Sequence, residues 1–189
     1  MIKVFLVEDE VVMRNGIKNN IPWEKEGLIF AGEASDGELA YPMIKKAQPD
    51  ILITDIRMPF MDGLELSELV KKEFPKIKII ILSGYNEFDY AKQAIHIGVT
   101  DYLLKPITAS KLLEAVKKVA DVIEKEREEE GMLERYRLEM AENTVLERQR
   151  LFRDLVTSRI NFKEALERGE ELGLELSASF YQLMLFKLI

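Results

Sequence analysis

The sequence predicts an α/β fold, a doubly wound parallel sheet of five strands with helices on both faces. Short apolar runs alternate with amphipathic helical segments throughout the first 122 residues, and the connections between them are short. Residues 51–53 are also apolar in succession, which is typical of a strand buried on both faces of a parallel sheet. A sheet of this kind needs helices on both sides to cover it.

The expected elements follow from the spacing of apolar residues and from the residues that start and stop them. Pro22 ends the first helix, Asp36 caps the second, Pro42 lies inside that second helix, and Gly98 closes the fourth. The strands are expected at residues 2–7, 28–34, 51–54, 77–82 and 99–104. The helices are expected at residues 11–19, 36–47, 64–74, 87–97 and from 110 onward. With five strands, the flavodoxin-like order 2-1-3-4-5 is the one expected.

Composition excludes several classes of function. No apolar run approaches the roughly 20 residues that a membrane-spanning helix needs, and Met1 leads directly into a strand without a signal-peptide pattern. Cysteine is absent, which excludes disulfides and thiolate chemistry. We therefore expect a cytoplasmic protein without a membrane partner. The net charge of −7 argues against nucleic-acid binding by the chain as a whole.

The last expected helix continues beyond the sheet. We predict a first domain at residues 1–122, a charged helical linker at 123–150, and the beginning of a second, truncated domain at 151–189. The nearly all-apolar stretch 180–189 predicts a final strand, which would need partner strands to protect its edge. Pairing of this strand within a dimer is the alternative.

The helix after Ser110 has two equally supported interpretations, a dimerising coiled coil and a solvated linker. A coiled coil needs an apolar seam, and Gly131 interrupts the segment. Three of the nine seam positions are charged. The seam would run through Leu112, Val116, Val119, Ile123, Glu126, Glu130, Leu133, Arg137 and Met140.

Polar side chains suited to a metal or a phosphoryl group stand at four strand ends. Glu8 and Asp9 follow the first strand, Asp55 the third, Ser83 the fourth and Lys105 the fifth. Because parallel strands end at the same edge of a sheet, we expect these side chains to converge. Three clustered carboxylates repel one another unless a cation lies among them, and oxygen ligands of this type suit Mg²⁺.

This set of residues is typical of phosphoryl transfer to a carboxylate. With Mg²⁺ neutralising charge, Asp55 can act as a nucleophile and form an acyl phosphate. Lys105 and Ser83 would contact phosphoryl oxygens as a positive charge and a hydrogen-bond donor. A role for Asp55 as a simple turn cap is the weaker interpretation, because it leaves the other strand ends unexplained.

In order and spacing, the motifs resemble the receiver domain of two-component response regulators. The matching segments are residues 7–10, 55–63, 82–84 and 102–106. The resemblance implies that Asp55 is the phosphoacceptor and that a sensor histidine kinase is the phosphodonor. It also implies a Mg²⁺ site made by Asp55, Asp9, Glu8 through water, and the backbone carbonyl of Arg57.

The same resemblance assigns further roles at the site. Ser83 and Tyr102 match the pair whose rearrangement carries the signal, Lys105 matches the lysine that contacts the phosphate, and Pro106 matches a proline commonly in a cis bond. Ser83 replaces the commoner threonine but keeps the hydroxyl.

A finer resemblance concerns regulators whose output domain is an AraC-type helix-turn-helix. Residues 20–23, 32–38 and 55–59 carry it. No such output domain is recognised in the 189 residues, so DNA binding and transcription regulation are expected only through a domain that they do not include. Homodimerisation through the helix after Ser110 is the expected mode of assembly if the coiled coil forms.

A hydrolase or phosphotransferase that uses the same nucleophile is the alternative from another class. A phosphatase needs a second acid close after the nucleophile to protonate the leaving group, and Arg57 stands at that position. We therefore favour a phosphoacceptor signalling domain, which catalyses only its own phosphorylation and dephosphorylation, over an enzyme.

Overall fold

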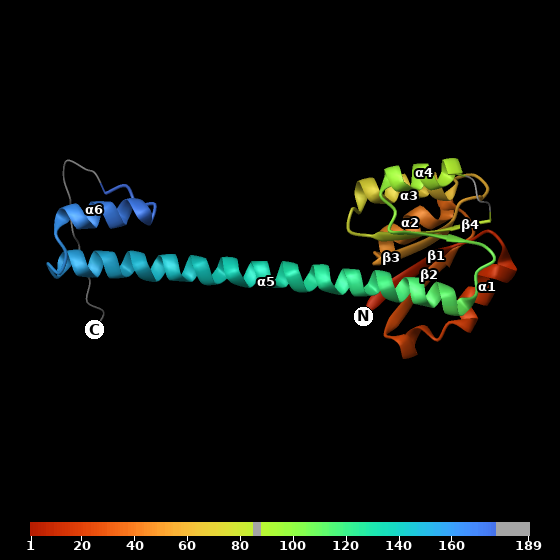
Figure 1. Cartoon of the computed structure of the whole chain (residues 1–189), viewed down its shortest axis with the longest axis horizontal. Coiled ribbons are helices and arrows are strands. Elements are labelled where there is room, and N and C mark those ends of the chain that lie inside the picture. The colour runs from red at the N-terminus through yellow and green to blue at the C-terminus, as the bar shows by residue number, and fades with distance from the viewer. Residues whose placement is uncertain (85–87, 177–189) are drawn as a thin grey trace. The chain divides into compact units, whose positions relative to one another are not determined.

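The first part of the chain folds into a parallel sheet of five strands (Figure 1). A computed structural model describes residues 1–84 and 88–176. The sheet order is β2-β1-β3-β4-β5, and each neighbouring pair is parallel. The strands are β1 (Ile2–Val7), β2 (Leu28–Ala34), β3 (Ile51–Asp55), β4 (Lys78–Ser83) and β5 (Asp101–Leu104). The predicted fold class and strand order are confirmed.

The helices begin and end close to the predicted positions in the first 109 residues. Asp36 caps the second helix by accepting a hydrogen bond from Leu39 N at 2.9 Å, and that helix includes Pro42. Gly98 closes the fourth helix with a left-handed φ of 80°. The expected start of that helix at Glu87 lies outside the described residues. The helices are α1 (Val11–Asn20), η1 (Trp23–Glu26, a 3₁₀ turn), α2 (Gly37–Ala47), α3 (Gly63–Glu73), α4 (Phe88–Ile97), α5 (Ala109–Val156) and α6 (Phe162–Glu171).

Apolar side chains form one buried cluster on each face of the sheet. Alternate residues of β1 separate the two, with Val4 and Leu6 in one cluster and Phe5 and Val7 in the other. The first cluster includes side chains of α1 and of the beginning of α5, and the second includes side chains of α2, α3 and α4. Helices therefore cover both faces, as a doubly wound sheet requires.

The chain divides into two compact units, Met1–Arg127 and Glu128–Ile189. Helix α5 contributes to both. In the first unit, four of the nine predicted seam positions pack against the sheet of the same chain and are buried: Leu112, Val116, Val119 and Ile123. These side chains are therefore part of the domain core. The helix continues through Gly131 to Val156, so the expected interruption is wrong and the boundary predicted at residue 150 falls inside a helix.

In the second unit, helix α6 packs against the last turns of α5. Leu151 and Ala165 are fully buried, and the guanidinium of Arg148 donates to the carbonyl of Leu172 with its Nη2 at 2.7 Å. Asn161 caps α6 by accepting from Glu164 N at 2.9 Å. The predicted strand at 180–189 lies outside the described residues.

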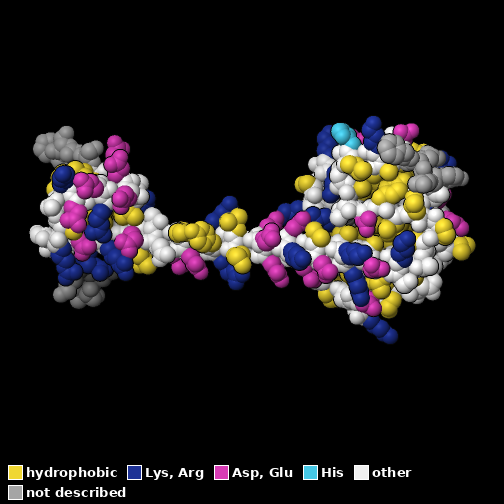
Figure 2. All heavy atoms as spheres, in the orientation of Figure 1, with side chains coloured by type: hydrophobic (Ala, Val, Ile, Leu, Met, Phe, Trp, Pro, Cys, Tyr) yellow, Lys and Arg dark blue, Asp and Glu magenta, His cyan; other side chains and the backbone are white. Residues whose placement is uncertain are grey.

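The middle of α5 exposes apolar side chains at helical spacing. Figure 2 shows hydrophobic side chains at the surface of this helix. The exposed apolar side chains of this stretch include Met132, Leu133, Tyr136 and Met140. In the described residues, no helix combines the length and apolar character that crossing a bilayer requires.

Candidate functional site

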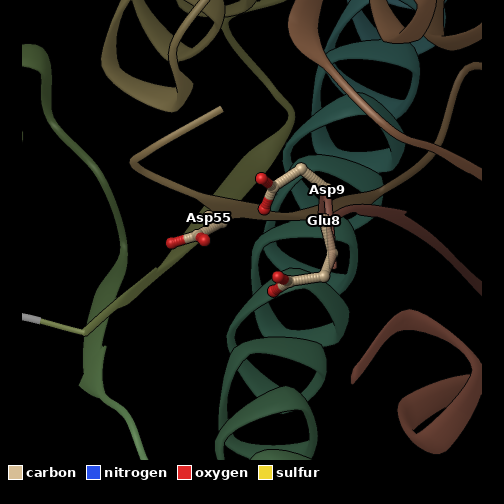
Figure 3. A group of neighbouring side chains, drawn as sticks. All are labelled: Glu8, Asp9 and Asp55. Atoms are coloured by element: carbon tan, nitrogen blue, oxygen red, sulfur yellow. The ribbon is translucent and has the colours of Figure 1, made fainter. Parts of the chain in front are cut away.

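Three carboxylates meet at the carboxyl edge of the sheet (Figure 3). Glu8 and Asp9 directly follow β1, and Asp55 is the last residue of the neighbouring strand β3. One oxygen from each carboxylate lies within 4.8 Å of the others. Glu8 is fully buried, Asp55 is 7% exposed and Asp9 is exposed, so the group reaches from the core to the surface.

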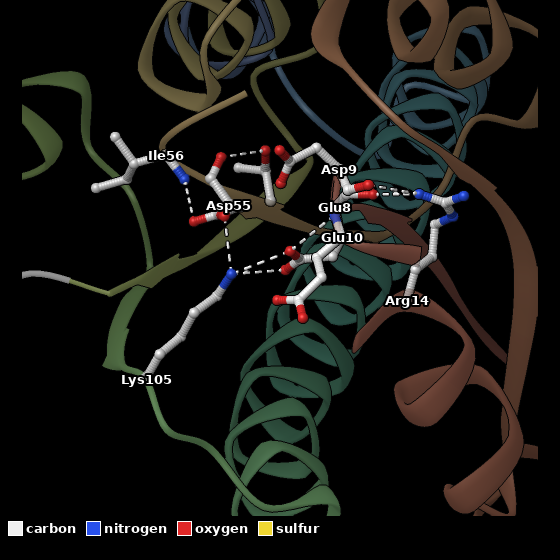
Figure 4. Close-up of polar contacts among 8 residues, drawn as sticks. Glu8, Asp9, Glu10, Arg14, Asp55, Ile56 and Lys105 are labelled. Carbon is white, nitrogen blue, oxygen red and sulfur yellow. Dashed lines mark hydrogen bonds and ion pairs between the residues drawn. The ribbon is translucent and has the colours of Figure 1, made fainter. Parts of the chain in front are cut away.

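The side chain of Lys105 bridges two of these carboxylates (Figure 4). Its Nζ donates to Asp55 Oδ2 at 2.8 Å and to the two oxygens of Glu8 at 2.9 and 3.0 Å. The backbone N–H of Lys105 donates to the carbonyl of Ser83 at 2.7 Å, which ties the end of β5 to that of β4. The Lys105–Pro106 peptide bond is cis, as the resemblance implied.

Burial and pairing act in opposite directions on the charges of this bridge. Burial raises the pKa of the Glu8 carboxyl, although Lys105 acts to lower it. For Lys105, burial acts to lower the pKa, but hydrogen bonds to Asp55 and Glu8 outweigh burial and raise it. Lys105 is therefore a permanent cation of the site at neutral pH.

Backbone groups hold Asp55 in place. The N–H of Ile56 donates to Asp55 Oδ1 at 2.7 Å, and the N–H of Gly63 donates to the carbonyl of Ile56 at 2.9 Å. A Cβ atom on Gly63 would lie 1.8 Å from the carbonyl oxygen of Asp55, so only glycine fits there. Nothing in the sequence indicates this close contact with the carbonyl of Asp55.

Arg14 is a residue of the site that the sequence analysis missed. It lies on α1, and its Nη1 donates to the carbonyls of Glu8 at 2.6 Å and Asp9 at 3.4 Å (Figure 4). It therefore fixes the backbone that presents the two acids. In the sequence, the one indication that Arg14 lies near these acids is its position one helical turn after Glu10.

Asp55 opens into a pocket of about 180 Å³. The lining residues are Asp55, Ile56, Arg57, Ser83, Gly84, Tyr90 and Lys105. The predicted Ser83 and Lys105 thus lie beside Asp55, and so does Arg57. Tyr90, on α4, was not singled out from the sequence, in which it is one aromatic residue of an amphipathic helix.

Tyr102 does not line this pocket. It lies on β5 opposite Ile81 of β4 and is half-buried. Its hydroxyl is buried and makes no hydrogen bond within the part of the chain that the structure describes. A buried hydroxyl of this kind gains from any rearrangement that supplies a partner.

The donor set fits a hard divalent cation. Glu8, Asp9 and Asp55 supply only carboxylate oxygens, which Mg²⁺ prefers. Both oxygens of Glu8 accept hydrogen bonds from Lys105, and both oxygens of Asp55 accept hydrogen bonds from Lys105 and Ile56. Asp9 is exposed, so it is the acid most accessible to an ion from solvent.

Comparison with known proteins agrees with this geometry. Residues 4–117 match the response regulator receiver domain. The chain belongs to this family. Receiver domains are signalling domains that generally partner with histidine kinases and generally bind Mg²⁺.

Two curated relatives are named as transcriptional regulators. The uncharacterized transcriptional regulatory protein YesN of Bacillus subtilis (strain 168) is 41% identical over 119 residues, which is 63% of this chain and 32% of that protein. The transcriptional regulatory protein HptR of Staphylococcus aureus (strain N315) is 39% identical over 112 residues, covering 59% of this chain and 44% of HptR. The chain thus spans less than half the length of these relatives.

Solved structures of two regulators share the fold. The receiver domain of AraT, a response regulator from Geobacillus stearothermophilus, matches with a TM-score of 0.63 and 39% identity over 67% of this chain and 98% of that one. A two-component transcriptional regulator AraC from Clostridium phytofermentans ISDg matches with a TM-score of 0.60 and 30% identity, over 68% of this chain and 99% of that one.

Proposed function

We propose that this receiver accepts a phosphoryl group on Asp55 from the phosphohistidine of a sensor histidine kinase. One observation carries the proposal: the Lys105 ammonium bonds directly to Asp55 and to the fully buried Glu8. A cation held against an acid at a strand end can meet the oxygens of a phosphoryl group bound to that acid.

The transfer needs no general acid on the receiver. An oxygen of Asp55 bonds to phosphorus as the phosphorus–nitrogen bond breaks, and the electron pair stays on that ring nitrogen; with the other ring nitrogen protonated, the donor leaves as neutral imidazole. Lys105 and Ser83, which both line the pocket, contact the phosphoryl oxygens. Ile56 N, which already donates to Asp55 Oδ1, keeps the carboxylate oriented.

A Mg²⁺ site completes the proposal. Asp9, Asp55 and the backbone carbonyl of Arg57 would hold the ion directly, and Glu8 would hold it through water. Mg²⁺, when bound, neutralises charge on the phosphoryl oxygens. The spacing of the three acids and the pairing of Glu8 with Lys105 support this division of roles.

The signal leaves the site through Ser83 and Tyr102. In this proposal the Ser83 hydroxyl moves to the phosphoryl group, and Tyr102 takes a new position in response. The hydroxyl of Tyr102 is buried and has no hydrogen-bond partner among the described residues. This supports a second position for the side chain, in which the hydroxyl gains a partner.

The output lies outside the receiver. We propose a receiver at residues 1–122, a helical linker at 123–150 and a second domain that includes residues 151–189, with helix α5 continuing unbroken across the boundary at 150. DNA binding and transcription regulation belong to an output domain of the full-length protein, and the names of YesN and HptR support this. A cytoplasmic location stays a prediction.

The phosphoacceptor is tested by intact-mass measurement. After incubation with acetyl phosphate and Mg²⁺, the wild type should gain about 80 Da, the mass of one phosphoryl group replacing a proton. Asp55→Asn should gain nothing, and chelation of Mg²⁺ should suppress the wild-type gain. The matched control is Asp121→Asn, an exposed acid of α5, which should behave as the wild type. An adduct that persists in Asp55→Asn contradicts the assignment.

Assembly is tested separately. Leu133, Tyr136 and Met140 are exposed at helical spacing, which favours pairing of two copies through α5. Light scattering should then give a mass near twice 21.9 kDa, and Leu133→Glu should return it to 21.9 kDa. A monomer at all concentrations would leave α5 as a solvated linker.

A further inference from the structure

Two side chains on the outer wall of the Asp55 pocket have no role in the function proposed above. Arg57 and Tyr90 both line the pocket. The guanidinium carbon of Arg57 lies 5.9 Å from the centre of the Tyr90 ring. At this distance the face of an aromatic ring attracts a cation. Tyr90 belongs to α4, so the contact joins the segment after β3 to a different element.

The negative charges around the pocket are not balanced by Lys105 alone. Lys105 is shared between Asp55 and Glu8, and Asp9 adds a third carboxylate nearby. A phosphoryl donor brings further negative charge to the same place. Among the residues that line the pocket, Arg57 and Lys105 are the cations, and Arg57 is the exposed one.

We infer that Tyr90 is a positioning residue, which holds the Arg57 guanidinium at the mouth of the pocket for the incoming phosphoryl dianion. The inference rests on the proposed phosphorylation of Asp55. The planar guanidinium can donate to two phosphoryl oxygens at once. The Tyr90 ring lies 5.9 Å from the guanidinium carbon and limits its motion, so less conformational freedom is lost when the dianion binds.

The step itself can be followed with acetyl phosphate. An oxygen of Asp55 bonds to phosphorus as the bond from phosphorus to the acetate oxygen breaks, and the electron pair leaves with acetate. No proton is transferred. Arg57 stays protonated throughout, so it acts only by charge and hydrogen bonding.

The test is the initial rate of phosphorylation by acetyl phosphate in Mg²⁺, followed by intact mass. Tyr90→Leu removes the ring and should lower the rate about fivefold, in the range expected for loss of a cation–ring contact. Tyr90→Phe keeps the ring face and should retain a rate within about twofold of the wild type. Arg57→Gln should lower the rate at least as much as Tyr90→Leu. The double variant should be no slower than Arg57→Gln alone, because Tyr90 acts through Arg57.

Salt separates positioning from a merely structural role. At about 1 M salt the Debye length falls to about 3 Å, so the loss caused by Tyr90→Leu should largely disappear. A loss that persists at high salt, that appears equally in Tyr90→Phe, or that multiplies with Arg57→Gln would overturn the inference. Phe162→Leu, at an exposed aromatic residue of α6, is the matched control and should keep the wild-type rate.

Two further outcomes are distinct. If Tyr90→Leu does not fold, wild type and Arg57→Gln are compared across salt concentrations, and an equal salt dependence overturns the inference. If the wild type gains no phosphoryl group, the proposed function fails. If the wild type gains one and Tyr90→Leu gains it at the same rate, only the role of Tyr90 fails.

Discussion

The carboxyl edge of the sheet and the middle of α5, residues 128–146, hold their side chains in different ways. At the sheet edge, Asp55 is contacted by the Lys105 ammonium, the Ile56 amide and the closely packed Gly63. On α5, Leu133 is 51% exposed and Tyr136 is 55% exposed. The first region is fixed by contacts from several elements, while the second presents an apolar face with few contacts of its own.

The difference shows what strand ends and helical periodicity in a sequence can each predict. Strand ends in a parallel sheet must share an edge, so residues at those ends are brought together by topology. Helical periodicity identifies a face but not its partner. The beginning and the middle of α5 illustrate this, because Leu112 is fully buried against the sheet and Leu133 is not.

The largest expected effect tests that contrast within one helix. Leu112→Ala should lower the free energy of unfolding by about 3 kcal/mol, because it leaves a cavity in the core. At concentrations where the protein is monomeric, Leu133→Ala, at a half-exposed site, should change it by less than about 0.5 kcal/mol. Urea unfolding followed by circular dichroism measures both. A cost at Leu133 comparable to that at Leu112 would break the comparison and show that another surface covers this face.

A pair of glycines sharpens the same comparison. Gly63→Ala should lower the free energy of unfolding by about 2 kcal/mol, since the added methyl group collides with the carbonyl of Asp55. Gly131→Ala should raise it by about 0.5–1 kcal/mol, because that helical position has open space around it. Thermal unfolding gives opposite shifts for the two. If Gly63→Ala left the free energy of unfolding unchanged, the backbone after Asp55 would be able to shift and relieve the collision.

The smallest effect concerns pH. The pKa of Glu8 is raised in the folded state by burial, so the folded protein holds this proton more tightly than the unfolded chain. The resulting stability is complete below the usual value of 4.5 and is lost as pH rises through the raised pKa. In the absence of Mg²⁺, the wild type should therefore lose stability relative to Glu8→Gln as pH rises from 4.5 towards neutrality.

Urea unfolding at a series of pH values measures this difference. Glu129→Gln removes an exposed carboxylate of α5 and is the matched control, whose profile should follow that of the wild type. Parallel profiles for Glu8→Gln and the wild type would show that Lys105 offsets the burial of Glu8 completely.

Much of the sheet and the positions of the strand-end residues could be predicted from the sequence. The apolar runs are short, and each stops at a polar or turn residue, so the strands and the sites at their ends follow together. Glu8, Asp9, Asp55, Ser83 and Lys105 lie at one edge for this reason.

The side chains that reach the site from helices could not be predicted. Arg14 contacts the carbonyls of Glu8 and Asp9 from α1, and Tyr90 lines the pocket from α4. Their contribution depends on the direction in which a helix presents each side chain to the sheet edge, which periodicity does not specify. The same limit explains why Leu112 and Val116 fitted a coiled-coil seam and in fact pack in the sheet's own core.

The Lys105 bridge has a consequence for ion selectivity. The Lys105 ammonium acts as a built-in counterion of the carboxylates. Because it is covalently attached to the chain, dissolved ions cannot exchange with it. Sodium or potassium must compete with an ammonium group that is always present, so we expect monovalent salts to occupy the site poorly. A divalent ion brings twice the charge to the three carboxylates, so we expect it to compete with the tethered ammonium group for Asp55 better than a monovalent ion does.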